Sequence, residues 1–237
     1  PYAAGDVIAL MTRWHKIPYL RTVTVGPFGV EFWNAGHILG SASIRVTAEG
    51  KTIVFSGDLG NMPPPFIAPT EYLTGADYAL IESAYGDRVH EDESARKSKL
   101  EDVIEETTSA GGTLMIPAFA LERTQDILFI LNELVENGRV PRMPVFLDSP
   151  LAIKLTAVYQ KYSGDPTYFN ANAIALIRRG DAIFDFPGLR LTLTTEQSKE
   201  IASVAGPKII IAGAGMSNGG RILHHEKRYL PDPNSTI

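Results

Sequence analysis

Two side chains that can bind a metal ion stand in glycine- and serine-rich turns of this sequence. His37 lies in the segment 36–43, and Asp58 lies in the segment 56–60. Each turn follows a run of residues typical of a β-strand, and glycine allows the chain to bend sharply there. Imidazole nitrogen and carboxylate oxygen are both zinc ligands, and a catalytic zinc usually takes three protein ligands. The pattern therefore predicts part of a metallohydrolase site.

Each candidate also has a purely structural interpretation, which the sequence leaves open. A single histidine in a loop is more often structural or solvated than bound to metal. An aspartate at a strand end, such as Asp58, also forms Asx turns or caps a helix. Glu82 follows the apolar strand pattern 78–81, at the strand end where α/β proteins place functional groups. Its structural alternative is an ion pair with Arg88 or Arg123.

A glycine-rich loop is the second feature that could take part in binding or catalysis. It follows the apolar run 208–211 and ends on Arg221 at the start of a helical pattern. Backbone N–H groups at a helix N-terminus suit phosphate, and a guanidinium adds a fork of donors. Gly213, Gly215 and Gly219 miss the dinucleotide fingerprint by one position. Two interpretations therefore remain open. The loop, with Gly219 and Gly220, binds phosphate, or it is a plain tight turn.

Further polar residues follow other predicted strands. Ser149 comes after the strand 145–147 and is predicted to cap the next helix, because the Gly-x-Ser-x-Gly elbow of a serine nucleophile is absent. Arg123 closes the loop after the strand 114–116. We expect the four loops after residues 81, 116, 147 and 211 to converge on one cleft. Of the pair His224 and His225, we expect one to face solvent and the other to pack inside.

Composition sets the class of the protein. Hydrophobic residues make up 44% and charged residues 21% of 237 residues, which is ordinary for a globular protein. The sequence has no cysteine, so any metal must be held by His, Asp and Glu. No apolar run approaches the roughly 18 residues of a membrane span. We therefore expect a cytoplasmic protein without a membrane partner.

The pattern of elements changes along the chain. Before residue 78 short strands predict an antiparallel meander, and from the buried strand 78–81 onward alternating strands and helices predict a parallel sheet. A boundary in the charged run 87–93 gives domains of 1–87 and 88–237. The expected helices are 6–14, 94–110, 123–137, 151–162, a short one from 195 or 198, and 221–229. The expected strands are 22–25, 30–33, 43–47, 52–55, 78–81, 113–116, 144–147, 189–194 and 208–211.

Six segments together resemble one family closely. They are 35–42, 55–61, 82–88, 116–125, 147–152 and 215–221, and they occur in the family's order. The chain resembles the metallo-β-lactamase-fold nucleases that carry a β-CASP insertion, in the RNA-processing branch with the cleavage and polyadenylation specificity factor. Ala84 is a small departure, because the family usually has threonine there.

The resemblance implies a fold and a reaction. The fold would be α/β, with residues 1–87 as the C-terminal portion of the first segment of a metallo-β-lactamase αββα sandwich. Residues 88–237 would form an α/β β-CASP domain, incomplete at its C-terminal end, with a parallel sheet. The reaction would be hydrolysis of RNA phosphodiester bonds at a site with two Zn²⁺ ions. The insertion domain would act as a lid and bind single-stranded RNA.

The resemblance also implies roles for single residues. His37 would ligate one zinc, and Asp58 would bridge both zinc ions and take part in catalysis. Glu82, the other catalytic residue, would orient a metal-bound histidine. Substrate would contact the residues of three loops, namely Arg221, Gly219, Gly220, Ser149 and Arg123.

Other consequences concern the ends of the chain. The opening at Pro1 without methionine, and the β-type run that begins at 234–237, lead us to expect a chain cut at both ends. The family's His-x-His-x-Asp-His cluster would precede residue 1, so we expect little or no nuclease activity from the isolated chain. The resemblance also allows a homodimer. The alternatives are a DNA-directed β-CASP nuclease, a non-catalytic RNA-binding homologue and, from the glycines alone, a nucleotide-binding domain.

Overall fold

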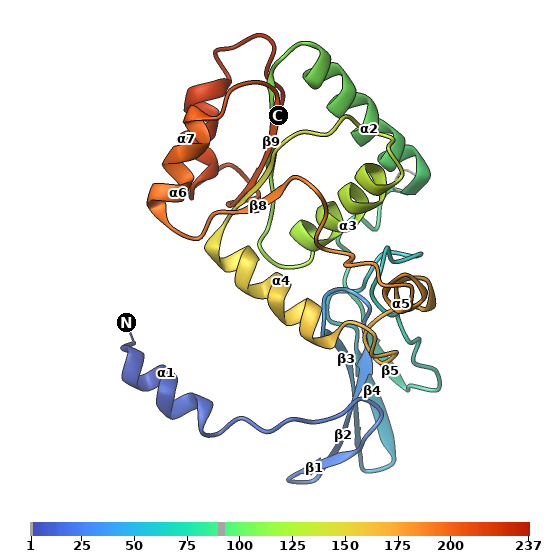
Figure 1. Cartoon of the computed structure of the whole chain (residues 1–237). Coiled ribbons are helices and arrows are strands. Elements are labelled where there is room, and N and C mark those ends of the chain that lie inside the picture. Colours follow the sequence, from blue (N-terminus) through green and yellow to red (C-terminus); the bar gives the residue numbers. More distant parts are fainter. Residues whose placement is uncertain (1, 90–92) are drawn as a thin grey trace. The chain divides into compact units, whose positions relative to one another are not determined.

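A computed structural model describes residues 2–89 and 93–237, which form two compact units (Figure 1). The first unit comprises the residues up to Met62 together with Pro69–Ser83. The second comprises Pro63–Ala68 together with the residues from Ala84 to Ile237. The charged run 87–93, in which the sequence places a domain boundary, includes residues 90–92, which lie outside the described part.

The first unit is built on a five-stranded sheet in the order β1-β2-β3-β4-β5. Strands β1 to β4 are antiparallel neighbours joined by short turns, which confirms the predicted meander. Gly26 and Gly50 have positive φ angles, and glycine reaches this conformation at little cost. The elements are α1 (Ala4–Met11), β1 (Val23–Val25), β2 (Phe28–Asn34), β3 (Ala42–Ala48), β4 (Lys51–Phe55) and β5 (Tyr78–Leu80).

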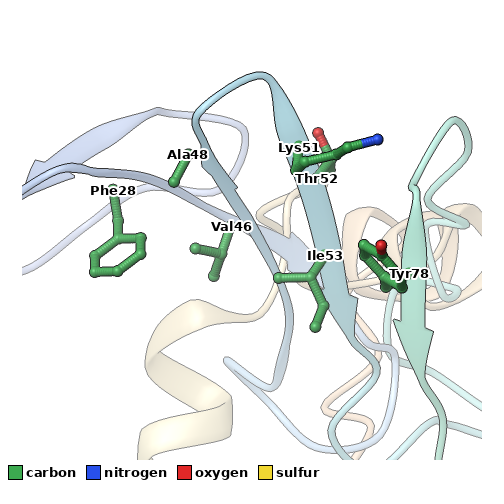
Figure 2. Close-up of a pocket in the computed structure, with 7 residues that line it drawn as sticks. All are labelled: Phe28, Val46, Ala48, Lys51, Thr52, Ile53 and Tyr78. Atoms are coloured by element: carbon green, nitrogen blue, oxygen red, sulfur yellow. The ribbon is translucent and has the colours of Figure 1, made fainter.

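Strand β5 differs from its prediction. It pairs in parallel with β4 of the first sheet, and all three of its residues are exposed. The expectation of a buried strand that begins the parallel α/β layer is therefore wrong. The physical reason is its place at the edge of the sheet, where it has a single strand neighbour. Figure 2 shows Tyr78 of β5 beside an open pocket of about 180 Å³ on this sheet. The other lining residues are Phe28, Val46, Ala48, Lys51, Thr52 and Ile53.

The second unit contains a four-stranded sheet in the order β6-β9-β7-β8, in which every pair is parallel. This confirms the predicted α/β layer. Helices α6 and α7 lie on one side of the sheet, and α2 and α3 lie on the other (Figure 1). The elements are α2 (Glu93–Ser109), β6 (Thr113–Pro117), α3 (Arg123–Glu136), β7 (Val145–Asp148), α4 (Pro150–Tyr162), α5 (Ala171–Arg178), β8 (Leu189–Leu191), α6 (Thr195–Glu200), η1 (Ile201–Ser203), β9 (Lys208–Ala212) and α7 (Ile222–Tyr229).

Two groups of apolar side chains hold this unit together. One packs the sheet against η1 and α7, and its buried members are Met115, Phe146, Ile201, Ile210, Ala212 and Ile222. The other is a set of aromatic rings centred on Phe66, namely Phe129, Tyr159, Phe169 and Phe184. Phe66 comes from the short segment Pro63–Ala68, whose Ala68 N–H donates to Tyr168 O at 2.8 Å. These contacts explain why that segment belongs to the second unit.

Several details differ from the sequence expectation or extend it. Helix α5 was not predicted, and the strand expected at 189–194 ends at Leu191. The expected β-type run near the end is confirmed, because Thr236 forms a parallel bridge with Leu114. Among the described residues, no helix is long and apolar enough to cross a membrane.

Candidate functional site

The loops that carry His37 and Asp58 are fastened to each other through their backbones. Gly60 N–H donates to Ala35 O at 2.9 Å, and Thr70 Oγ1 donates to the same carbonyl at 2.9 Å. A Cβ atom on Gly60 would lie 1.6 Å from the carbonyl oxygen of Gly36, so only glycine allows this approach. The turn after β4 therefore lies directly against the turn after β2.

Each loop also fixes its own shape. Ser41 Oγ accepts hydrogen bonds from the N–H groups of His37 and Ile38, at 3.1 and 3.2 Å. The His37 imidazole and the Asp58 carboxylate are themselves exposed. Within residues 2–89 and 93–237, neither group has a hydrogen-bond or ion-pair partner. Asp58 therefore does not cap its own turn, and both side chains are available to a ligand.

Glu82 supports the loop of Asp58. Its Oε1 atom accepts a hydrogen bond from Leu59 N–H at 2.5 Å, and its own N–H donates to Ser56 Oγ at 2.9 Å. The cations considered as alternative partners pair elsewhere, since Arg88 contacts Asp87 and Arg123 contacts Asp126. Glu82 thus holds the backbone beside Asp58, and its expected action on a metal-bound histidine stays a prediction.

The available donors suit a divalent metal ion. Imidazole nitrogen and carboxylate oxygen both bind zinc, and His37 and Asp58 present them from two joined loops. The part of the chain that the structure describes contains no group of three or more His, Asp and Glu side chains placed to hold a metal. The geometry therefore places two donors of the right kind on adjoining loops, and their binding of a metal ion stays a prediction.

We expect a Gly60→Ala substitution to destabilise the first unit by about 1–3 kcal/mol or more, as overpacking usually does. The new methyl group would overlap the Gly36 carbonyl and force the two loops apart. Thermal unfolding followed by circular dichroism measures the change. Gly5→Ala is the control, because open space surrounds Gly5 in α1. Equal stability of the two variants would contradict the close approach of the loops.

In the second unit, three loops meet at the carboxyl edge of the parallel sheet. Ala118 N–H donates to Ala212 O at 3.0 Å. A Cβ atom on Gly213 would lie 4.0 Å from Ser149 Oγ. The predicted convergence is therefore confirmed for the loops after residues 116, 147 and 211. The loop after residue 81 begins in the first unit and passes into the second at Ala84, and its part in that prediction stays untested.

A buried carboxylate, Asp148, lies at the centre of this edge. Its Oδ1 accepts from Thr192 Oγ1 at 2.6 Å and Arg221 Nη1 at 2.7 Å. Its Oδ2 accepts from Ser198 Oγ at 2.6 Å and lies 2.7 Å from His225 Nε2. Burial by itself would raise the pKa of Asp148, but the bonds to His225, Ser198, Thr192 and Arg221 lower this pKa to about 2.

Arg221 belongs to this network. Its Nη1 also donates to Thr192 O at 2.9 Å, and its Nη2 donates to Leu193 O at 3.2 Å. The side chain is 22% exposed. The guanidinium thus joins the start of α7 to the ends of β7 and β8, and any contact with substrate would use its outer edge.

The histidine pair after Arg221 follows its prediction. His225 is buried on Asp148, whereas His224 is exposed. Sequence reasoning missed Asp148 as the centre of the network because it considered only Ser149 in that loop. An aspartate at the end of a fully apolar strand was the available signal.

The other predicted substrate-binding residues have defined structural settings. Ser149 accepts a hydrogen bond from Ala152 N–H at 3.3 Å, which confirms it as the cap of α4. Gly220 has a positive φ angle, and a Cβ atom there would lie 2.4 Å from Gly213 O. Gly219 O accepts from Ala214 N–H at 3.0 Å. Arg123 begins α3 and reaches Asp126 at 3.5 Å on the surface. Their roles toward a substrate stay predictions.

Comparison with known proteins identifies the family to which this architecture belongs. A family model described as the Beta-Casp domain matches residues 124–237. The chain belongs to the β-CASP family. Within this β-CASP chain, the matched region runs from α3 to the end, so it contains the Asp148 network and the glycine-rich loop. The α/β fold with a parallel sheet is the one expected for the family.

Relatives of this β-CASP chain have names that refer to RNA. The chain is 36% identical to Ribonuclease TTHA0252 of Thermus thermophilus over 241 residues, which cover 100% of the chain and 54% of the relative. It is 34% identical to an RNase J-like protein of Methanocaldococcus jannaschii, over 87% of the chain and 47% of the relative. It is 30% identical to Endoribonuclease ysh1 of Schizosaccharomyces pombe, over 100% of the chain and 30% of the relative. The chain spans about half or less of the length of these relatives.

Proposed function

We propose that this protein takes part in the metal-dependent hydrolysis of RNA phosphodiester bonds. The observation that carries the proposal concerns two exposed donors, His37 and Asp58, which have no partner among the described residues. They stand on two loops that meet at Gly60. Relatives named ribonuclease and endoribonuclease support RNA as the substrate class.

The residues of the first unit would bind the metal ion and hold its ligands in place. His37 and Asp58 would hold the metal, and Glu82 would keep the backbone beside Asp58 in place. We propose zinc, because nitrogen and oxygen donors suit it, with a second ion as the family resemblance implies. When bound, the metal would supply a Lewis acid that stabilises charge developing on the phosphate.

The residues of the second unit would bind the substrate. We propose that single-stranded RNA contacts the carboxyl edge of the parallel sheet, near Arg221, Gly219, Gly220 and Ser149. Arg123 also belongs to this proposal, because its guanidinium is about half exposed at the start of α3. A cation within hydrogen-bonding reach of a phosphate contributes a salt-dependent share of RNA affinity.

The proposal is tested with matched labelled oligonucleotides, one of single-stranded RNA and one of DNA with the same sequence. We expect cleavage of the RNA by a protein that also carries the histidine cluster which the resemblance places before residue 1. We expect loss of this cleavage in EDTA, and recovery when zinc or manganese is added in excess of the chelator. Cleavage of the DNA alone would support the DNA-directed alternative. Tight RNA binding without cleavage at any metal concentration would instead support a non-catalytic RNA-binding protein.

A further inference from the structure

The carboxyl edge of the parallel sheet carries four large apolar side chains that are exposed. Each follows a different strand: Phe119 follows β6, Leu151 lies in the first turn of α4 after β7, Leu193 follows β8 and Met216 follows β9. Their exposed fractions are 56, 60, 48 and 70%. Single exposed apolar residues are normal on a folded protein, so what points to a binding site is how one of them, Phe119, is held.

The backbone of Phe119 is held firmly although its ring is open to solvent. Its carbonyl oxygen accepts two hydrogen bonds from Thr124, from N–H at 3.2 Å and from Oγ1 at 2.7 Å. Thr124 is buried, and the preceding Ala118 N–H is bonded to Ala212 O. Because the backbone is fixed, only the side-chain torsions of Phe119 remain to be ordered when its ring binds a flat partner.

The Phe119 ring lies directly against the backbone at Gly215, which has no side chain. A Cβ atom on Gly215 would lie 3.0 Å from Phe119 Cδ2 and 2.8 Å from Phe119 N. The Cβ atom of any other residue at position 215 would displace the Phe119 ring from this position. The glycine therefore has a role beyond the tight turn, since it lets the ring lie against the loop while more than half of Phe119 stays exposed.

A cation lies at the other end of the same edge. Arg221 Nη2 contacts Leu193 O, just beyond β8, and the side chain is partly exposed. In the order β6-β9-β7-β8, the strands that lead to Phe119 and Leu193 are three spacings apart, or roughly 14 Å. Glu196 is close enough to interact with Arg221 and would oppose a phosphate there. The edge thus combines an aromatic face with one partly exposed guanidinium.

We propose that Phe119 stacks on an unpaired nucleobase of single-stranded RNA. Proteins that bind single strands join aromatic platforms to cations in this way, and stacking tolerates any base because every base has a flat face. The inference rests on the proposed function, because the ribonuclease relatives make RNA the occupant considered. It goes further by naming the residue and the part of RNA that it contacts.

The test measures binding of a labelled single-stranded RNA to the protein by fluorescence anisotropy in EDTA, which separates binding from hydrolysis. We expect Phe119→Ala to weaken binding about five- to tenfold or more. Phe119→Leu keeps apolar bulk without the ring and should weaken binding similarly, whereas Phe119→Trp should retain it. Tyr72→Ala removes an exposed aromatic side chain of the first unit and serves as the matched control.

A second oligonucleotide with abasic sites distinguishes stacking from a general loss of binding. The unsubstituted protein should bind it less tightly, and Phe119→Ala should then have almost no further effect. Equal losses on both oligonucleotides, or a Phe119→Leu variant within twofold of the unsubstituted protein, would overturn the proposal. RNA binding with the expected losses, but without cleavage in the separate assay with added metal, would contradict hydrolysis and leave the stacking intact. No RNA binding at all would overturn both.

Discussion

An Arg221→Ala substitution is expected to lower the free energy of unfolding of the second unit by about 3–5 kcal/mol. The substitution removes the cation from Asp148, a carboxylate with no exposed surface. Thr192 and Ser198 would still donate to it, but the negative charge would remain buried beside one histidine. Urea unfolding followed by circular dichroism measures the change.

Arg142→Ala provides the matched control for this experiment. Arg142 is exposed, so its removal should change the free energy of unfolding by less than about 0.5 kcal/mol. A loss below 1 kcal/mol in Arg221→Ala would mean that Asp148 does not depend on the guanidinium. The result also bears on RNA binding, because a weaker affinity of Arg221→Ala has to be measured where the variant is still folded.

The same network gives the stability a defined dependence on pH. The pKa of Asp148 falls from an ordinary 3.8 to about 2 in the folded protein. A group with a lowered folded pKa stabilises the protein above its unfolded pKa, and this stabilisation of roughly 2 kcal/mol disappears as the pH falls from 3.8 through 2. Asp148→Asn should flatten this part of the urea-midpoint profile. An unchanged profile would contradict the lowered pKa.

In a protein that also carries the histidine cluster expected before residue 1, His37→Ala and Asp58→Asn are each expected to reduce RNA cleavage on the order of 100-fold or more. The reason is that losing even a residue that supports a metal ligand costs 10–100-fold. The folded state should hardly change, since both side chains are exposed and have no partner in the described ranges. Initial rates on labelled single-stranded RNA and the metal content of the purified protein are the two measurements.

His224→Ala is the control for His37→Ala. It removes another exposed histidine, on α7, and should leave both cleavage and metal content unchanged. Full cleavage by His37→Ala and Asp58→Asn would overturn the assignment of these residues to the metal. A loss of cleavage together with a lower unfolding temperature would point to damaged loops instead.

Local patterns made much of this architecture predictable. Strand and helix periodicity gave the antiparallel meander and the parallel sheet, and glycines beside His37 and Asp58 marked the two loops. What the sequence could not reveal depends on distant partners. Asp148 is 73 positions from Arg221 and 77 from His225, and no local pattern predicts such contacts. The apolar residues of β5 predict a buried strand, because residue types do not reveal the edge position of a strand.

The place of β9 has a consequence for synthesis on the ribosome. Residues 208–212 are the last strand of their sheet to be made, yet they lie between β6 and β7. Until they emerge, β6 has no neighbouring strand among those of this sheet. Met115 and Phe146 also lack their packing partner Ile210 in the hydrophobic core. Such non-local pairing folds slowly and leaves strand edges open to aggregation. We therefore expect the nascent chain to be prone to aggregation until β9 is inserted.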